Sequence, residues 1–119
     1  MNRPVVAIVD DDPRVLASLV ELLESAGYGT QSFPSGEALL AFGLQGVDVL
    51  ITDIGMPGAD GFELRDIVRQ ASPELPVFLM SGRHEIADQD RGIGGFLRKP
   101  FDGHALLAAV RDVLDIGRD

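Results

Sequence analysis

Acidic residues stand directly after two apolar runs of this sequence. Asp10 and Asp11 follow the run 4–9, and Asp53 follows the run 47–52. A carboxylate at the end of a buried strand costs free energy unless a charge partner or a ligand stabilises it. Three such carboxylates close together would raise one another's pKa values, and a divalent cation removes that conflict. Because the group contains no Cys or His, it favours a cation with oxygen ligands, Mg²⁺ before Ca²⁺.

The chemistry that suits these residues is phosphoryl transfer to a carboxylate. We interpret Asp53 as a nucleophile that attacks a phosphoryl donor and becomes an acyl phosphate. The cation and the Lys99 ammonium would neutralise charge on the equatorial phosphoryl oxygens, which is most of what this reaction requires. The Ser81 hydroxyl can donate a hydrogen bond to the new phosphoryl group. If Ser81 moves toward it, Phe96, three residues before Lys99, is placed to fill the space left behind.

Five apolar runs alternate with amphipathic segments along the chain. The apolar runs predict buried strands at residues 4–9, 30–33, 47–52, 76–80 and 95–98. Apolar residues at helical spacing predict helices at residues 13–26, 36–42, 61–71 and 102–116. The polar stretch 83–91 has no such row, and we assign it a short helix. The alternation indicates an α/β fold whose parallel sheet is covered on both faces.

Other side chains of the predicted helices have structural interpretations. Asp12 before Pro13, Ser35, and Asp60 three residues before Glu63 are expected to be helix N-caps. The apolar residues expected on inward helix faces include Phe42, Ile67 and Ala71. His84 and His104 have no partner at ligand or catalytic spacing and are expected on the surface. Arg65 and Arg69 lie one helical turn apart and are expected to form a solvated face rather than a phosphate clamp.

Right-handed crossovers make the expected arrangement a doubly wound, flavodoxin-like (βα)5 fold with strand order 2-1-3-4-5. Ligands of such sheets bind beyond the carboxyl ends of the strands, near the switch point between strands 1 and 3. The polar residues singled out above follow four different strands of this sheet. The topology therefore predicts that Asp10, Asp11, Asp53, Ser81 and Lys99 converge on one site.

Length and composition narrow the classes of function. The chain has 119 residues, the size of one domain, and 10 basic against 19 acidic residues give a net charge of −9. Nucleic-acid binding needs clustered Lys and Arg, so we do not expect it here. The absence of Cys fits the cytoplasm, and no run of apolar residues approaches the ~20 needed to span a membrane. Residues 116–119 could be a true end or the point before a second domain.

Four motifs occur together in this order: VDDDP at residues 9–13, DIGMPGADG at 53–61, MSG at 80–82 and FLRKPF at 96–101. With them the chain resembles the receiver domains of two-component response regulators. Each motif alone is weak, but the ordered set covers nearly the whole chain and is highly specific. The resemblance implies that residues 1–119 form a single receiver domain.

The resemblance also implies roles for individual residues. Asp53 would be the phosphoacceptor, and Lys99 would pair with the phosphoryl group. Mg²⁺ would be held by Asp10, Asp11 and Asp53 with the backbone carbonyl of Gly55. Ser81 and Phe96 would be the switch pair. The Lys99–Pro100 peptide bond is expected to be cis.

The phosphoryl donor would be a sensor histidine kinase or a phosphotransfer protein. Phosphorylation would shift the face formed by residues 83–116, which are the fourth helix, the fifth strand and the last helix. That face would control a C-terminal output domain or a separate effector, or form a phosphorylation-dependent homodimer. Such a domain catalyses only its own phosphorylation and dephosphorylation and is not otherwise an enzyme.

Two features depart from the family pattern. The segment between Ser81 and Lys99 is about four residues shorter than usual, roughly one helical turn, which shortens the helix expected at 83–91. Gly55 stands two residues after the acceptor, where the family more often has a larger side chain, and it leaves attacking water less obstructed. Arg83, two residues after Ser81, is large and could cover part of the site.

Three alternative functions compete with the receiver. A Mg²⁺-dependent phosphohydrolase with an aspartyl nucleophile would use Asp10 with Asp12 two residues later, but the chain has no cap domain and Asp53 would be unexplained. A degenerate receiver would bind partners without phosphate, although all key positions are filled here. A flavodoxin would need a phosphate loop after the first strand, where this chain is acidic.

Overall fold

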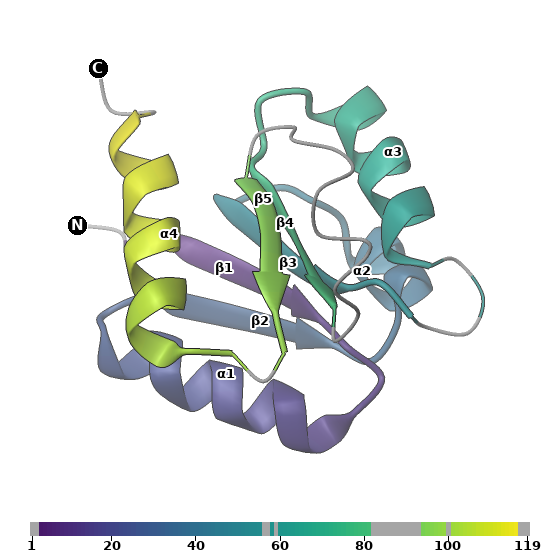
Figure 1. The fold of residues 1–119 in the computed structure, drawn as a ribbon. Coiled ribbons are helices and arrows are strands. Elements are labelled where there is room, and N and C mark those ends of the chain that lie inside the picture. The colour runs from purple at the N-terminus through teal and green to yellow at the C-terminus, as the bar shows by residue number, and fades with distance from the viewer. Residues whose placement is uncertain (1–2, 56–57, 59, 82–93, 100, 117–119) are drawn as a thin grey trace.

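The computed structural model describes residues 3–55, 58, 60–81, 94–99 and 101–116 (Figure 1). Within these residues, five parallel strands form one sheet in the order β2-β1-β3-β4-β5. The strands are β1 (Val5–Val9), β2 (Gly29–Phe33), β3 (Val49–Asp53), β4 (Val77–Ser81) and β5 (Gly94–Arg98). The predicted fold class and strand order are therefore confirmed.

Four helices connect or follow the strands in the described part of the chain. They are α1 (Pro13–Ser25), α2 (Gly36–Phe42), α3 (Gly61–Ala71) and α4 (Gly103–Ile116). The label α4 belongs to the helix predicted at residues 102–116. The short helix predicted at residues 83–91 lies outside the described residues, so the structure does not bear on it. No helix of the described residues is long and apolar enough to cross a membrane.

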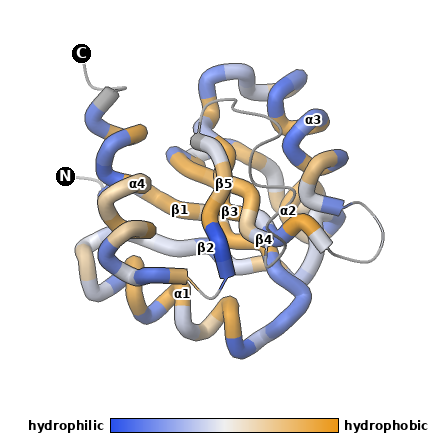
Figure 2. The backbone as a smooth tube through the Cα atoms, in the orientation of Figure 1, coloured by the Kyte–Doolittle hydropathy of each residue, from blue (hydrophilic) through white to orange (hydrophobic). Residues whose placement is uncertain are grey.

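Helices cover both faces of the sheet (Figure 1), and a hydrophobic core layer lies on each face. Side chains of one strand alternate between the layers: Ala7 and Val9 of β1 pack with α2 and α3, whereas Val6 and Ile8 pack with α1 and α4. Burial on both faces explains why the central strands read as continuous apolar runs. Figure 2 shows this as a band of hydrophobic residues along β1 and β3.

The predicted capping residues begin three of the helices. The side chains of Asp12, Ser35 and Asp60 accept hydrogen bonds from backbone N–H groups at the starts of α1, α2 and α3. Gly27, with a φ of +97°, follows the end of α1 in a left-handed conformation that glycine adopts at little cost. These local signals were sufficient to locate the helix ends to within a residue or two.

The predicted inward faces of α2 and α3 were partly wrong. Phe42 is 59% exposed and Ile67 is 43% exposed, and Ala71 is also exposed. Phe42 is the last residue of its short helix, and one side of its ring lies beside Phe33, with centroids 5.4 Å apart. On α3 the buried row runs through Gly61, Leu64, Arg65 and Val68.

Arg65 was predicted on a solvated face, but it is only 7% exposed. The physical reason lies at the start of α3. Gly61 packs so closely on the end of β3 that a Cβ atom there would be 2.5 Å from the carbonyl oxygen of Asp53. This contact fixes the rotation of α3 about its axis, which turns Arg65 inward and Ile67 outward.

Candidate functional site

The predicted site residues lie at the carboxyl ends of the strands. Asp53 is the last residue of β3, Ser81 is the last residue of β4, and Asp10 and Lys99 directly follow β1 and β5. Backbone hydrogen bonds continue past the strand ends: the N–H of Asp10 donates to the carbonyl of Phe33 at 3.2 Å, and that of Lys99 to the carbonyl of Ser81 at 2.9 Å. The backbone at these positions is thus tied to the neighbouring strands.

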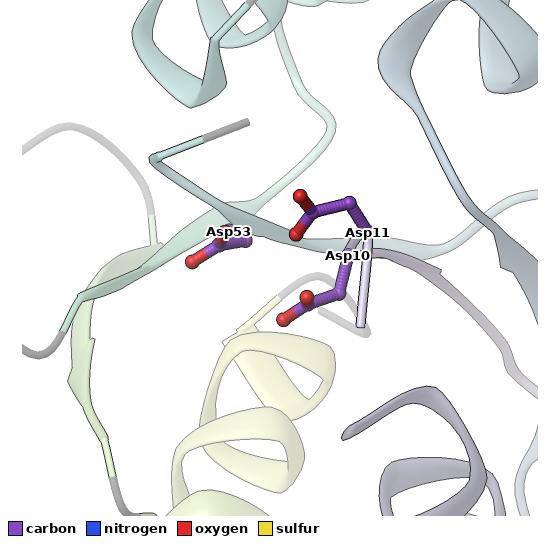
Figure 3. A group of neighbouring side chains, drawn as sticks. All are labelled: Asp10, Asp11 and Asp53. Carbon is purple, nitrogen blue, oxygen red and sulfur yellow. The ribbon is translucent and has the colours of Figure 1, made fainter. Parts of the chain in front are cut away.

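Three carboxylates gather at this edge of the sheet (Figure 3). Asp10, Asp11 and Asp53 each offer one oxygen, and these oxygens all lie within 4.8 Å of one another. Asp10 and Asp53 are buried, whereas Asp11 is exposed. Three carboxylate oxygens at this spacing suit a hard divalent cation, which would relieve their mutual repulsion. The residues present therefore fit a magnesium ion.

Among the described residues, Lys99 supplies a positive charge to this carboxylate cluster. Its Nζ atom lies 2.9 Å from Asp10 Oδ2 and 2.9 Å from Asp53 Oδ1. Burial of the ammonium works to lower the pKa of Lys99, but the hydrogen bonds and charges of Asp10 and Asp53 outweigh it, so its pKa is raised above 10.5. Lys99 is therefore a protonated ammonium at neutral pH, held directly against the proposed acceptor.

Asp12 has the structural role that was predicted for it. Its side chain accepts a hydrogen bond from the backbone N–H of Arg14 at 2.9 Å, and its own backbone N–H donates to Asp10 Oδ1 at 2.9 Å. The hydrogen bond from the Arg14 side chain, together with that backbone bond, holds the pKa of Asp12 below its usual value. The N–H of Asp12 also helps to orient Asp10, because it holds Oδ1 of that carboxylate while Lys99 donates to Oδ2.

Sequence reasoning missed two residues whose hydrogen bonds hold the backbone around Asp53. Gly61 donates its N–H to the carbonyl of Ile54 at 3.0 Å, which binds the start of α3 to the turn after Asp53. Thr52 is buried, and its hydroxyl donates to the carbonyl of Asp53 at 3.1 Å. The pair Asp60-Gly61 was available as a signal for the first, but the sequence holds no signal for the bond made by Thr52.

Ser81 and Phe96, predicted as a switch pair, are both partly buried. Phe96 packs against the core layer of α2 and α3, where its ring meets that of Phe62. Gly55 is exposed, and a Cβ atom built on it would have no atom within 4 Å, which agrees with the open approach expected there. His104 is exposed as predicted. The expectations for Pro100, Arg83 and His84 fall on residues outside those that the structure describes.

Comparisons with known proteins identify the family of this chain. Residues 6–111 match the family described as response regulator receiver domain. The heme response regulator HssR of Staphylococcus aureus is 34% identical over 112 residues, which cover 90% of this chain and 50% of that protein. The chain thus spans about half the length of the curated relatives that it matches.

Solved structures show the same fold. A receiver domain from Clostridium thermocellum superposes with a TM-score of 0.89 at 22% identity, covering 97% of both chains. The chemotaxis protein CheY4 of Vibrio cholerae superposes with a TM-score of 0.82 at 28% identity, covering 93% of this chain and 98% of that one. The chain belongs to the family of response regulator receiver domains, which act in two-component signalling. Family membership displaces the flavodoxin and phosphohydrolase alternatives.

Proposed function

We propose that Asp53 is the phosphoacceptor of a Mg²⁺-dependent phosphoryl transfer from a sensor histidine kinase or a phosphotransfer protein. The observation that carries this proposal is the placement of Lys99, whose ammonium lies 2.9 Å from Asp53 and 2.9 Å from Asp10 beside the three-carboxylate cluster. Phosphoryl transfer of this kind uses a carboxylate nucleophile, a site for a divalent cation and a fixed positive charge.

In the proposed reaction, an oxygen of Asp53 attacks the phosphorus atom of a phosphohistidine. The P–N bond of the donor breaks, and the imidazole leaves with the electron pair of that bond. Lys99, already paired with Asp53, stays within reach of the phosphoryl oxygens that replace its carboxylate partner. A magnesium ion held by Asp10, Asp11, Asp53 and the carbonyl of Gly55 would supply further charge neutralisation.

Asp10 has a second task in this scheme, which is to orient Lys99. Both of its oxygens are engaged, one by Lys99 and one by the N–H of Asp12. The carboxylate is buried and cannot rotate without losing one of these bonds. Hydrolysis of the acyl phosphate would use the same site. A water molecule that approaches past the open position at Gly55 would attack the phosphorus atom, the P–O bond to Asp53 would break, and inorganic phosphate would leave.

The proposed output is a conformational shift read by another domain or protein. Ser81 and Phe96 would be the switch pair, and the surface that changes would be built by residues 83–116. We further propose that residues 1–119 form one receiver domain that lies in the cytoplasm. This domain would catalyse only its own phosphorylation and dephosphorylation. Its output would be an attached domain, a separate effector or a phosphorylation-dependent homodimer.

The test is incubation with Mg²⁺ and acetyl phosphate, followed by intact mass measurement, with beryllofluoride binding observed in parallel by NMR. We expect one acid-labile phosphoryl group, absent from Asp53→Asn. Asp66→Asn is the matched control, because Asp66 is an exposed acid on α3 outside the carboxylate cluster. If acetyl phosphate does not modify the protein and beryllofluoride does not bind it at millimolar Mg²⁺, the proposal fails, and a receiver that works without phosphate becomes the better account.

A further inference from the structure

Arg65 is a cation in the buried row of α3. It is 7% exposed, and its guanidinium carbon lies 5.3 Å from the centroid of the Phe62 ring. That distance is within the range of a cation–π interaction, which is stronger when the cation is shielded from water. The guanidinium therefore helps to fix the orientation of the Phe62 ring, three residues earlier on the same helix.

The Phe62 ring contacts Phe96 as well. The two ring centroids are 6.4 Å apart and the ring planes meet at 60°, an edge-to-face arrangement that aromatic pairs favour. Both rings are partly buried against the core layer of α2 and α3. Arg65, Phe62 and Phe96 thus form a continuous row from α3 to β5, which we call the α3–β5 row.

Phe62, the middle member of the row, is tied through its backbone to the proposed phosphoacceptor. Phe62 follows Gly61, whose N–H donates to the carbonyl of Ile54 at 3.0 Å. A Cβ atom on Gly61 would be 2.5 Å from the carbonyl oxygen of Asp53, so the backbones are in close contact. The backbone of Phe62 therefore cannot shift without disturbing the turn after Asp53. Phe96 consequently packs on a residue whose backbone is held in place.

We propose that Phe62 and Arg65 are positioning residues that hold Phe96 in its resting place and so set how readily the domain switches. The inference rests on the proposed function, in which Ser81 and Phe96 are the switch pair. In this structure Lys99 pairs with the Asp53 carboxylate itself, so the α3–β5 row belongs to the unmodified form. Contacts that stabilise this form oppose the switch, and weakening them shifts the population toward the switched form.

The first experiment measures beryllofluoride binding in the presence of Mg²⁺ by NMR titration. Phe62→Leu removes the ring, and we expect about 2- to 10-fold tighter apparent binding, the factor that one aromatic pair is worth. Arg65→Met keeps an unbranched apolar stem but removes the guanidinium group, and it should act in the same direction by a smaller factor. Phe62→Tyr keeps the ring and should bind like the wild type. Arg69→Met, one turn further along α3, is the matched control and should not change the affinity.

The second experiment asks whether Phe62 acts through Phe96. In a Phe96→Leu background, Phe62→Leu should have no further effect on beryllofluoride affinity, because the ring that it positions is gone. Equal effects of Phe62→Leu in both backgrounds would overturn the inference. Unchanged or weaker binding in the single variant would do the same. If the wild type binds no beryllofluoride at all, the proposed function itself fails, which separates the two failures.

A third measurement does not depend on phosphorylation. A fluorinated phenylalanine placed at position 96 reports by ¹⁹F NMR the ring current of a neighbouring aromatic side chain. We expect its resonance to move in Phe62→Leu and in Arg65→Met, but to stay in place in Phe62→Tyr and Arg69→Met. If the chemical shift of this resonance is unchanged in both Phe62→Leu and Arg65→Met, Phe96 is not positioned by α3.

Discussion

The ammonium of Lys99 lies 2.9 Å from Oδ2 of Asp10, although the two residues stand near opposite ends of the sequence. Asp10 is completely buried, and a buried carboxylate without a partner would be costly. Lys99 is the only lysine among the 10 basic residues of the chain. One side chain therefore both balances the buried acid and stands beside the proposed acceptor.

Replacing Lys99 by Met should destabilise the fold, because Asp10 and Asp53 lose their shared cation. A broken, fully buried pair costs roughly 3–5 kcal/mol. The Lys99 side chain is 25% exposed, so we expect a loss of about 2 kcal/mol in the free energy of unfolding. Urea denaturation measures it. Arg98→Met, an exposed neighbour on β5, is the control and should change the free energy of unfolding little. Equal stability of Lys99→Met and wild type would contradict the pairing.

The pH dependence of stability follows from the raised pKa of Lys99. The group holds its proton more tightly in the folded chain than in the unfolded chain, where its pKa is near 10.5. Its contribution is therefore complete below pH 10.5 and is lost as the pH rises through the folded value. We expect the free energy of unfolding of the wild type to fall more steeply above that pH than that of Lys99→Met. Parallel curves for the two proteins, measured by urea denaturation from neutral to alkaline pH, would show that Lys99 gains no stabilising partner on folding.

The convergence of Asp10, Asp11, Asp53 and Lys99 was predictable because it follows from topology. Apolar runs reveal buried parallel strands, and the carboxyl ends of such strands meet at one edge of the sheet. Strand ends need to be located only to within a residue for this argument, and they were. The capping residues were equally predictable, because each bond spans only two or three residues.

The faces of α2 and α3 were not fully predictable, because helix rotation depends on contacts distant in sequence. The helical spacing of apolar residues predicts both Ile67 and Val68 on the inward face and does not distinguish between them. The close approach of Gly61 to Asp53 decides between them and turns Arg65 inward. No pattern in the sequence indicates that an arginine would pack on Phe62, since that contact needs both the rotation of α3 and its distance from the sheet.

Asp11 should matter for the metal and little for the fold. It is exposed, whereas its neighbours in the cluster, Asp10 and Asp53, are buried. A ligand that binds only the folded state raises the melting temperature, so we expect millimolar Mg²⁺ to raise that of the wild type by a few degrees. Asp11→Asn should melt like the wild type without Mg²⁺ and should lose most of the rise with it.

Asp66→Asn provides the comparison, because it removes an equivalent exposed charge away from the cluster and should keep the full response to Mg²⁺. Calorimetry with and without Mg²⁺ gives the six melting temperatures of the wild type and the two variants. The carboxylate cluster would not be the magnesium site if Asp11→Asn kept the same rise as Asp66→Asn.

Gly61→Ala should damage both the fold and the site. The added methyl group would lie 2.5 Å from the carbonyl oxygen of Asp53 and 2.8 Å from the Cα of Ile54, so backbone must move to admit it. Overpacking of this kind costs about 1–3 kcal/mol, and we expect the upper part of that range because neither neighbour is a flexible side chain. The displaced turn carries Asp53, so beryllofluoride affinity should fall as well.

Gly55→Ala separates this steric effect from the general loss of a glycine. Its added methyl group would meet no atom within 4 Å, so its free energy of unfolding and its affinity for beryllofluoride should stay close to those of the wild type. Urea denaturation and NMR titration of the two variants make the comparison. If Gly61→Ala matched Gly55→Ala in both measurements, the start of α3 would be free to move relative to Asp53. The turn after Asp53 and the α3–β5 row would then not be rigidly joined, because the position of Phe62 depends on the same contact.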